Sequence, residues 1–452
     1  MNKPFLLRPL LGLPLFAFWF LITASSLNAQ ESADSLRLEE ALMQSLTQNH
    51  AIRGARYRDT VSMNDALPGN AGLLPTISLN GTYQEQLQNT ETQFANPEMM
   101  PIEADGANTT TYNASVGLEY TLFNGLTRIR SRERLKASRE QTRAQTRQTV
   151  EQTLLATAQS YLQAARQAEN LRIQQEAVAL SRERMERSQI AYELGSGSRL
   201  ARLNAEVDLN ADSAALLQAK TALANAKRQL KAQMGQAPEA DFVLARQIDL
   251  RGAMEPGELQ SRAQADNSRL AQLEQQMRVA RLQEQIARGG QYPRLQLSSQ
   301  YGYNRQEYEA NFLTSQESLG LTAGLSVAYT LYDGNQRNIQ IDNARLGMAR
   351  VEAQQEQARL EIQREVANTF ADFQNQQKRL ALAQRNRQTA QLNFERSREA
   401  YRTGNITSTQ LREAQVNLIR AEQQVSNLRF DLKFTELSLM QLSGQILEEM
   451  PN

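Results

Sequence analysis

The spacing of hydrophobic and polar residues changes period along the chain. From Leu36 to about Met63 the apolar residues recur at helical spacing, which predicts a helix. After Pro75 they alternate with polar residues, and a second alternating run follows, so we expect strands over residues 74–83 and 113–123. The segment between these runs, rich in Asn, Thr and Glu, is expected to be a polar loop. The two runs together predict a hairpin.

A long polar helix is expected after this hairpin, over residues 126–193. No Gly or Pro occurs between Leu126 and Glu193, and at ~1.5 Å per residue such a helix would be ~100 Å long. Its apolar residues repeat every seven positions, which is typical of helices that supercoil around neighbours. Gly195 then marks a tight turn into a return helix over residues 198–234. A simple fibrous coiled coil would explain these helices but not the strands.

The same pattern is written a second time. Thr121-Leu-Phe-Asn-Gly125 corresponds to Thr330-Leu-Tyr-Asp-Gly334 at an offset of 209 (330 − 121), and Gly235 corresponds to Gly444 at the same offset. The second copy predicts a helix from 258 to 287, strands 294–303 and 319–332, a long helix 335–402 and a return helix 407–443. The copies thus occupy residues 30–235 and 258–444, joined by a connector, 236–257, and followed by a short tail, 445–452. A repeat of this kind must bury its apolar stripes against its twin or against neighbouring subunits.

The first residues are typical of a secretory signal. Lys3 and Arg8 precede an apolar run, and small residues up to Ala29 are suited to cleavage, so residues 1–29 are expected to be removed. A retained anchor is less favoured because Pro9 and Pro14 interrupt the run. No later segment has a comparable apolar length, so a mature chain in a membrane would have to cross it as strands.

Composition excludes several classes of function. The 50 Lys and Arg balance 49 Asp and Glu, which gives no indication of a nucleic-acid partner. There is no Cys, so disulfides, thiolate metal sites and Cys nucleophiles are excluded. The single His, His50, is expected to be a surface residue, and no nucleophile or phosphate motif indicates a hydrolase. We therefore expect no cofactor, no metal and no catalysis.

The strands alone leave two alternatives open. Each run is close to the ~9–11 residues that a tilted strand needs to cross a bilayer, but an antiparallel sheet with one wet face predicts the same alternation. Four strands cannot close a transmembrane barrel, since the smallest single-chain barrels have about eight. A membrane location would therefore require several chains.

In combination these features resemble the TolC family of outer-membrane channel proteins over essentially the whole mature chain. Leu-Pro and Tyr-Pro lead into strands, an Asn-Gly or Asp-Gly pair follows the second strand of each copy, and a Tyr-x-x-Gly motif marks each helical turn. Each motif is weak by itself, but together, in order and twice, they are specific. The residues are Leu74-Pro75, Tyr292-Pro293, Leu122 to Gly125, Leu331 to Gly334, Tyr192 to Gly195 and Tyr401 to Gly404.

The resemblance implies a mainly α fold with a transmembrane β part. Three chains would form a twelve-stranded β-barrel in the outer membrane and a trimeric α-helical barrel across the periplasm. It implies a passive exit duct for a tripartite efflux pump or a type I secretion system. The expected partners are a second and third copy of the chain, outer-membrane lipid, a periplasmic adaptor protein and an inner-membrane transporter of RND, MFS or ABC type. The alternative is a periplasmic structural or tethering coiled coil.

The resemblance also implies site residues. Gln410 and Glu413 stand at the positions of the acidic ring that narrows the tunnel, so one acidic site is kept and the other is an amide. The position that matches the family's acidic partner of Tyr401 is Ala201, so other residues are expected to complete the tip network. That network would comprise Tyr192, Tyr401, Arg199, Arg202 and Glu206. The adaptor would contact the two turns, Leu194, Gly195, Ser196 and Gly197 with Thr403, Gly404, Asn405 and Ile406, while Asn124, Gly125, Asp333 and Gly334 form the strand-to-helix junctions.

Overall fold

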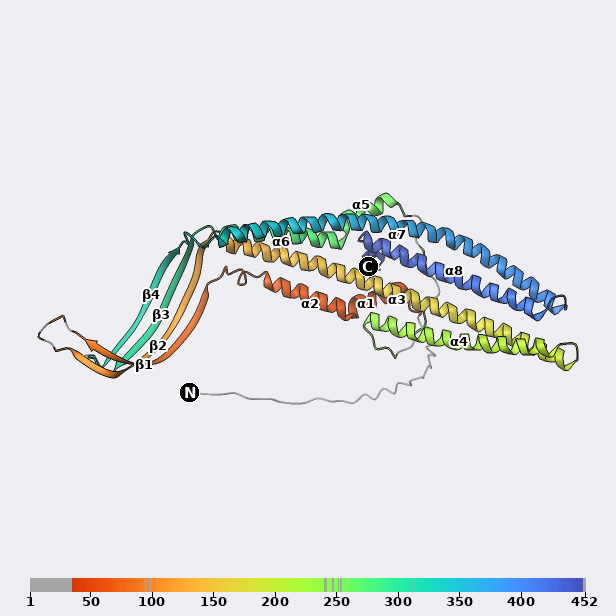
Figure 1. Cartoon of the computed structure of the whole chain (residues 1–452), viewed down its shortest axis with the longest axis horizontal. Coiled ribbons are helices and arrows are strands. Elements are labelled where there is room, and N and C mark those ends of the chain that lie inside the picture. Colours follow the sequence, from red (N-terminus) through yellow and green to blue (C-terminus); the bar gives the residue numbers. More distant parts are fainter. Residues whose placement is uncertain are drawn as a thin grey trace, which may run out of the picture.

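The protein is elongated, with a sheet at one end and two helical hairpins at the other (Figure 1). The computed structural model describes residues 35–449 except 94, 97, 99, 240, 241, 246, 247, 251, 253 and 312. The predicted signal peptide, residues 1–29, and the last residues of the predicted tail lie outside the described residues. No helix in the described ranges is both long enough and apolar enough to cross a membrane.

The elements follow the same order in both halves. The first half contains α1 (Leu38–Gln48), α2 (His50–Asp65), β1 (Thr76–Thr92), β2 (Ile102–Asn124), α3 (Thr127–Glu193) and α4 (Arg199–Met234). The second half contains α5 (Pro256–Asp266), α6 (Ser268–Gly289), β3 (Arg294–Tyr308), β4 (Ser315–Ala328), α7 (Gln336–Arg402) and α8 (Ser408–Leu442), followed by the short helix η1 (Ile446–Glu449).

The duplication seen in the sequence is also a duplication of structure. Helices α3 and α7 each contain 67 residues. They begin 209 residues apart (336 − 127) and end 209 residues apart (402 − 193). Each returns through a short turn into α4 or α8, and the two hairpins run side by side to the tip end of the molecule (Figure 1). The expected fold, mainly α with a four-stranded β part and an internal duplication, is confirmed.

The helix that was predicted before the strands of each copy, from Leu36 to about Met63 and from 258 to 287, is not continuous. Each of these leading helices is broken by one asparagine, so the prediction of unbroken helices was wrong. Asn49 and Asn267 adopt extended backbone angles, and each side-chain oxygen accepts bonds from the first N–H groups of α2 or α6. The Asn49 Nδ2 donates to the Gln233 carbonyl at 2.7 Å, and the Asn267 Nδ2 donates to the Leu442 carbonyl at 2.9 Å. Each asparagine thereby caps one helix and satisfies a free carbonyl at the end of another.

The sheet is antiparallel in the order β1-β2-β3-β4. Its first hairpin is longer than the sequence predicts, because pairing continues through the segment 84–111 that was expected to be a loop. Gln88 pairs with Ala107, and Thr92 with Ile102, so only residues 93–101 turn between the strands. Backbone pairing does not require apolar side chains. A prediction based on the alternation of apolar and polar residues therefore underestimated the length of these strands. Strand β3 likewise extends from the predicted 303 to Tyr308.

Strand β4 ends earlier than predicted, at Ala328 instead of residue 332. Its only neighbour in the sheet is β3, and that strand begins at Arg294, which pairs with Ala328. Residues 329–332 therefore have no strand beside them in the single chain. Their first-copy counterparts, residues 120–123, end in Phe123, which does pair with Leu295 of β3.

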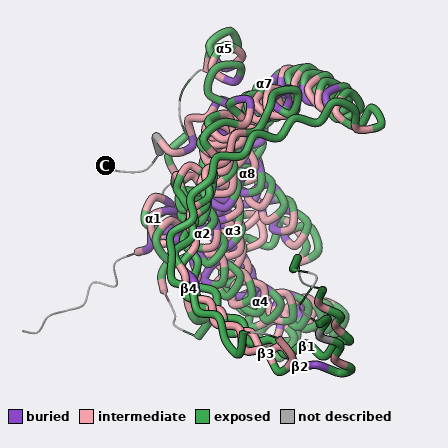
Figure 2. The backbone as a smooth tube through the Cα atoms, turned by 90° about the vertical axis from the view of Figure 1, so that its left-hand side faces the viewer, coloured by how far each residue is buried: buried purple, intermediate pink, exposed green. Residues whose placement is uncertain are grey.

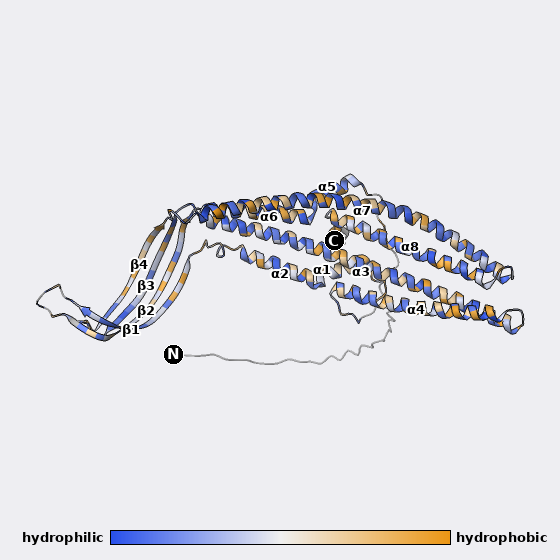
Figure 3. Ribbon diagram, viewed as in Figure 1, coloured by the Kyte–Doolittle hydropathy of each residue, from blue (hydrophilic) through white to orange (hydrophobic). Residues whose placement is uncertain are grey.

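Strands β1 and β4 are exposed on both faces, and none of the helices that the structure describes covers the sheet (Figures 1 and 2). The sheet nevertheless has two distinct faces, because apolar and polar rows alternate across all four strands. Leu79, Val116, Tyr301 and Leu321 form one such row. The adjacent row, on the opposite face, contains Ser78, Gly117, Gln300 and Thr322. Figure 3 shows this alternation of apolar and polar positions along the strands.

The hydrophobic core lies in the middle of the helical part, where α1, α3, α4 and α8 meet. Leu154, Tyr161 and Leu437 are fully buried there, and the Tyr161 hydroxyl donates to the Leu36 carbonyl at 3.0 Å. Burial raises the pKa of the Tyr161 phenol, so the hydroxyl stays protonated and keeps donating this bond. This core joins the first hairpin, α3 and α4, to α8 of the second hairpin.

Candidate functional site at the helical tips

Both helical hairpins turn with the same backbone geometry. In the first tip, Gly195 has φ 72°, its N–H donates to the Tyr192 carbonyl at 3.1 Å, and the Ser196 N–H donates to the Ala191 carbonyl at 2.9 Å. In the second, Gly404 has φ 73° and the equivalent bonds are 3.2 and 2.8 Å long. This is a Schellman-type helix end, which requires the left-handed region that glycine adopts without strain.

The return helices begin with side-chain caps. Ser198 accepts from the Ala201 N–H at 3.1 Å in the first tip. In the second, Thr407 and Gln410 form a reciprocal capping box, with bonds of 3.3 and 2.9 Å. Apart from the half-buried Gly197 and Ile406, the predicted adaptor-contact residues are exposed, and Leu194 presents 77% of its surface. The two tips thus offer rigid, exposed turns.

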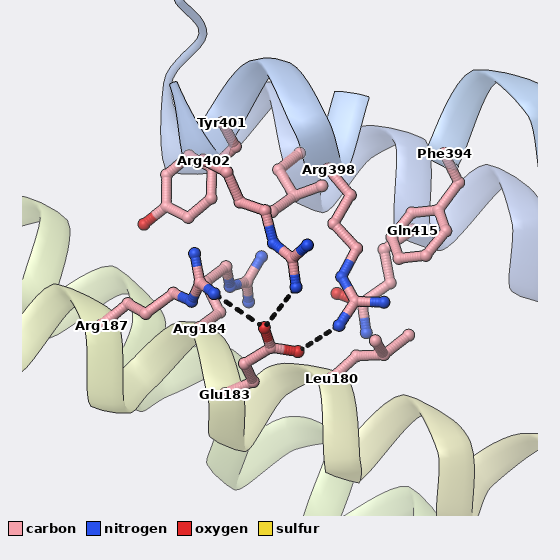
Figure 4. A pocket seen from close by; sticks show the side chains of 10 residues that line it. Leu180, Glu183, Arg184, Arg187, Phe394, Arg398, Tyr401, Arg402 and Gln415 are labelled. Carbon is pink, nitrogen blue, oxygen red and sulfur yellow. Dashed lines mark hydrogen bonds and ion pairs between the residues drawn. The ribbon is translucent and has the colours of Figure 1, made fainter. Parts of the chain in front are cut away.

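The predicted tip network is only partly assembled in the single chain. The Arg202 guanidinium lies 5.7 Å from the centre of the Tyr192 ring and 3.7 Å from the Glu206 carboxylate. Arg199 is exposed in the first turn of α4. Tyr401 lines a different site, a groove between α3, α7 and α8 whose lining includes none of the three α4 residues (Figure 4). Within one chain, therefore, Arg199, Arg202 and Glu206 do not take the place of the carboxylate that the resemblance leads one to expect at Ala201.

The two predicted constriction residues lie on α8. Both Gln410 and Glu413 are exposed, and Gln410 also completes the capping box with Thr407. Arg412, which lies between them, points to α4 instead. Adjacent residues of a helix point in different directions. Glu413 therefore lies on the solvent-exposed face of α8, whereas Arg412 faces α4.

The strand-to-helix junctions repeat one geometry in both copies. The Asn124 side chain accepts from the Arg128 N–H at 3.4 Å, and the Asp333 carboxylate accepts from the Arg337 N–H at 3.3 Å and from the Arg337 Nε at 2.6 Å. Gly125 and Gly334 both have φ 66°. The junction residues act as caps that hold each long helix to its strand.

A buried polar network lies just behind the tips, and the sequence analysis missed it. Arg412 on α8 makes a bidentate pair with Asp212 on α4, at 2.6 and 2.8 Å. Ser181 on α3 donates to the same carboxylate, and Arg184 on α3 pairs with Asp208 at 2.6 Å. The network therefore ties α3, α4 and α8 together, and we call these five residues the three-helix clasp.

The surroundings of the two clasp arginines shift their pKa values in opposite directions. The hydrogen bond to Asp212 raises the pKa of the Arg412 guanidinium, while burial lowers the pKa of the Arg184 guanidinium despite the charge of Asp208. Arg184 is the more deeply buried of the two. Its Nε and Nη1 atoms have no hydrogen-bond partner among the described residues. This arginine is therefore incompletely satisfied.

A departure from the internal repeat could have indicated the clasp. At the offset of 209, Asp208 and Asp212 correspond to Asn417 and Ala421, Ser181 corresponds to Ala390, and Arg412 corresponds to Leu203. At Asp208, Asp212 and Arg412 the clasp residue is charged and its counterpart in the other copy is not. At Ser181 a hydroxyl group is replaced by the methyl group of alanine. Such asymmetry is expected where two similar units contact each other, because the contact uses different faces of each.

Within the described residues, no group of His, Cys, Asp and Glu side chains has the arrangement that could hold a metal ion. His50 is exposed at the start of α2. The chemistry of the tip region is thus that of arginine–carboxylate pairs, caps and exposed apolar turns.

The family model described as outer membrane efflux protein matches residues 41–236 and 259–445. No curated protein sequence matches the chain significantly. The fold is similar to that of the CmeC outer membrane channel of Campylobacter jejuni, with a TM-score of 0.77 and 14% identity over 97% of this chain and 94% of that one. It is also similar to the MtrE outer membrane channel of Neisseria gonorrhoeae, with a TM-score of 0.74 and 16% identity over 92% and 91% of the two chains.

A third similar structure is the outer membrane protein VceC of Vibrio cholerae, with a TM-score of 0.71 and 17% identity over 90% of this chain and 96% of that one. At these identities the structures establish the fold, and the match to the family model establishes the family. Its two matched segments fall on the two copies of the repeat. The resemblance recognised in the sequence is thereby confirmed: the chain belongs to the outer membrane efflux protein family and is an efflux protein of the outer membrane.

Proposed function

We propose that three copies of this chain form a passive, water-filled exit duct for a tripartite efflux pump. The observation that carries the proposal is a set of unfilled contacts in the single chain. Its sheet is uncovered on both faces, and one of its two long helices lacks the neighbours that its twin has. Three chains would supply both, since three sets of four strands make a twelve-stranded closed barrel.

The unfilled helix contacts are visible when α3 is compared with α7. Helix α3 packs against α6 and α8 of the second copy. Ala137 and Ile173 of α3 are each 1% exposed, whereas their counterparts on α7, Leu346 and Leu382, are 68% and 63% exposed (346 − 137 = 209; 382 − 173 = 209). Helix α7 has a larger apolar side chain than α3 at the first position and one of similar size at the second, yet both side chains of α7 are exposed to solvent.

The repeat predicts what would cover α7. The counterparts of α6 and α8 in the first copy are α2 and α4, so α7 of one chain is expected to pack against α2 and α4 of the next. One contact can be specified. Glu151 on α3 accepts from the Ser268 hydroxyl at 2.6 Å, and the counterparts of these residues are Leu360 (151 + 209) and His50 (268 − 218). Head-to-tail contacts of this kind close into a ring.

Disulfide trapping tests this assembly, because the chain contains no native Cys. The double variant His50→Cys with Leu360→Cys should give covalent trimers after mild oxidation in membranes, and each single variant should not. Lys136→Cys with Leu360→Cys serves as a control pair that the repeat does not bring together. Absence of any cross-linked species from the matched pair, in protein that reaches the outer membrane, would contradict the proposed ring.

The exposed tips support docking of a periplasmic adaptor, which would connect the duct to an inner-membrane transporter. Gly195→Pro or Gly404→Pro should abolish export while the trimer still assembles. Proline cannot adopt positive φ and removes the N–H that bonds to Tyr192 or Tyr401. Export of a pump substrate from cells that carry each variant is the measurement. Normal export by both variants would exclude docking at the tips.

We further propose that Glu413 contributes to the narrowest part of the duct. It is exposed on α8 beside the tip, and three such carboxylates around one axis would attract cations and repel one another. Glu413→Ala should raise single-channel conductance or weaken block by multivalent cations in planar bilayers. Glu176→Ala, on an exposed part of α3, is a suitable control. Unchanged conductance and unchanged block would remove Glu413 from the constriction.

A further inference from the structure

The groove beside Tyr401 contains more positive charge than its own residues neutralise. It lies between α3 on one side and α7 with α8 on the other (Figure 4). Four arginines line it, namely Arg184, Arg187, Arg398 and Arg402, together with a single carboxylate, that of Glu183. Because like charges held close together repel, such a cluster is most stable when further negative charge is present.

Glu183 is shared among three of these arginines. Its oxygens lie 2.7 Å from Arg398, 3.2 Å from Arg187 and 3.8 Å from Arg402 (Figure 4). The last two contacts are made to the same oxygen, and 3.8 Å is too long for a hydrogen bond. Arg402 also lies 3.9 Å from the Glu399 carboxylate, so Glu183 is left mainly to Arg187 and Arg398 and compensates these two guanidinium groups incompletely.

The fourth arginine, Arg184, supplies an independent indication of a ligand. Its side chain is 2% exposed, it lines the groove, and only its Nη2 has a partner, Asp208. The Nε and Nη1 donors have none among the described residues. Buried charged donors without acceptors are costly, so an acceptor supplied from outside the chain, either water or an anion, would stabilise this arginine.

The shape of the groove limits what that acceptor can be. Its apolar residues, including Phe394 and Leu411, are already buried against each other and against Leu180. The open space of about 350 Å³, which is continuous with solvent, is bordered both by these apolar side chains and by guanidinium groups. The forked donors of the guanidinium groups match the oxygens of a tetrahedral or planar oxyanion.

We propose that this groove binds a small oxyanion of the phosphate or sulfate class, held by Arg184, Arg187 and Arg398. The anion takes acceptor positions that Glu183 fills only in part, and it joins the first-copy helix α3 to the second-copy helix α7 just behind the tips. The site occurs once per chain, because the counterparts of Glu183 and Arg398 in the other copy are Leu392 and Gln189. It does not depend on adaptor docking or on the direction of transport.

Calorimetric titration of the full mature chain, purified in detergent, with inorganic phosphate tests the site. Chloride at matched ionic strength serves as the reference anion. The wild-type protein should bind about one phosphate per chain. Arg398→Gln should weaken binding about tenfold or more, since it removes a charge-assisted donor. Arg359→Gln, an exposed arginine elsewhere on α7 that is paired with Glu356, should leave binding unchanged.

The decisive variant is Glu183→Gln. If the groove binds an anion, removal of the competing carboxylate should tighten phosphate binding about tenfold. If the arginines serve only to pair with Glu183, this variant should not bind phosphate any better than the wild type. The proposal is overturned if the wild type does not bind phosphate in a saturable manner, even where Glu183→Gln does, if chloride competes equally well, or if Arg359→Gln weakens binding as much as Arg398→Gln.

Discussion

At the residue scale, the two strand-to-helix junctions differ in how well their side chains suit the backbone. Leu126 and Asn335 occupy the same position in the two copies, with φ of 64° and 68°. Asparagine tolerates this left-handed conformation, whereas a leucine there is strained by contact between its Cβ and the backbone. Leu126 is also half exposed, so it gains little from packing in return.

Leu126→Asn is therefore expected to stabilise the protein by about 1 kcal/mol, and Asn335→Leu to destabilise it by a similar amount. Urea denaturation of the purified protein, followed by far-ultraviolet circular dichroism, measures both changes. The two variants exchange the same pair of residues in opposite directions and so control for each other. A loss of stability in Leu126→Asn would mean that the leucine has a packing role that outweighs the strain.

At the scale of elements, the return helices end against the breaks between the paired leading helices. Gly444 follows α8 with φ 75°, and a Cβ there would lie 2.6 Å from the Asp266 carbonyl oxygen. Gly235 follows α4 in the same way, and a Cβ there would also lie 2.6 Å from a carbonyl oxygen, that of Gln48. These contacts, with the caps from Asn49 and Asn267, join each return helix to the helix pair of its own copy.

Gly444→Ala is expected to destabilise the protein clearly more than Gly404→Ala. Both glycines have nearly the same positive φ, so the backbone strain of alanine is similar. Only Gly444 is in close contact, since nothing lies within 4 Å of a Cβ at Gly404. The clash should add about 1–3 kcal/mol to the free-energy cost. Denaturant midpoints of the two variants provide the comparison, and equal midpoints would show that the helix end can move away.

At the scale of the whole molecule, the proposed barrel would place one face of the sheet against lipid. The apolar row that contains Leu321 runs across all four strands, and so does the polar row that contains Thr322. In a closed barrel the first row would face lipid and the second the interior. If this assignment is right, a charged side chain should hinder assembly at Leu321, which would face lipid, and should be tolerated at Thr322, which would face the interior.

Leu321→Arg should lower the yield of folded channel in the outer membrane, because an arginine at mid-depth on the lipid face costs about 2–4 kcal/mol. Thr322→Arg should assemble normally and change conductance instead. Trimer content of outer-membrane fractions and planar-bilayer recordings separate the two effects. Normal assembly of Leu321→Arg together with failure of Thr322→Arg would reverse the assignment of the faces.

Most of the element pattern could be predicted from the sequence, because it depends on local periodicity and on an internal repeat. Where the prediction was wrong, backbone partners decided the outcome and side-chain pattern did not. The polar ends of β1 and β2 are strands because they pair with each other. Residues 329–332 are not in a strand because β3 does not extend beside them. Asn49 and Asn267 break their helices because the ends of α4 and α8 lie next to them.

The sequence by itself determined the repeat, the long helices, the tips and the family, since these rest on spacing and motifs along one chain. Only the tertiary structure decided which charged residues meet. Asp212 and Arg412 are 200 positions apart, and Glu183 and Arg398 are 215 apart. No periodicity connects such positions, because their distance depends on how the two hairpins pack. The clasp and the arginine groove are therefore properties of the folded molecule.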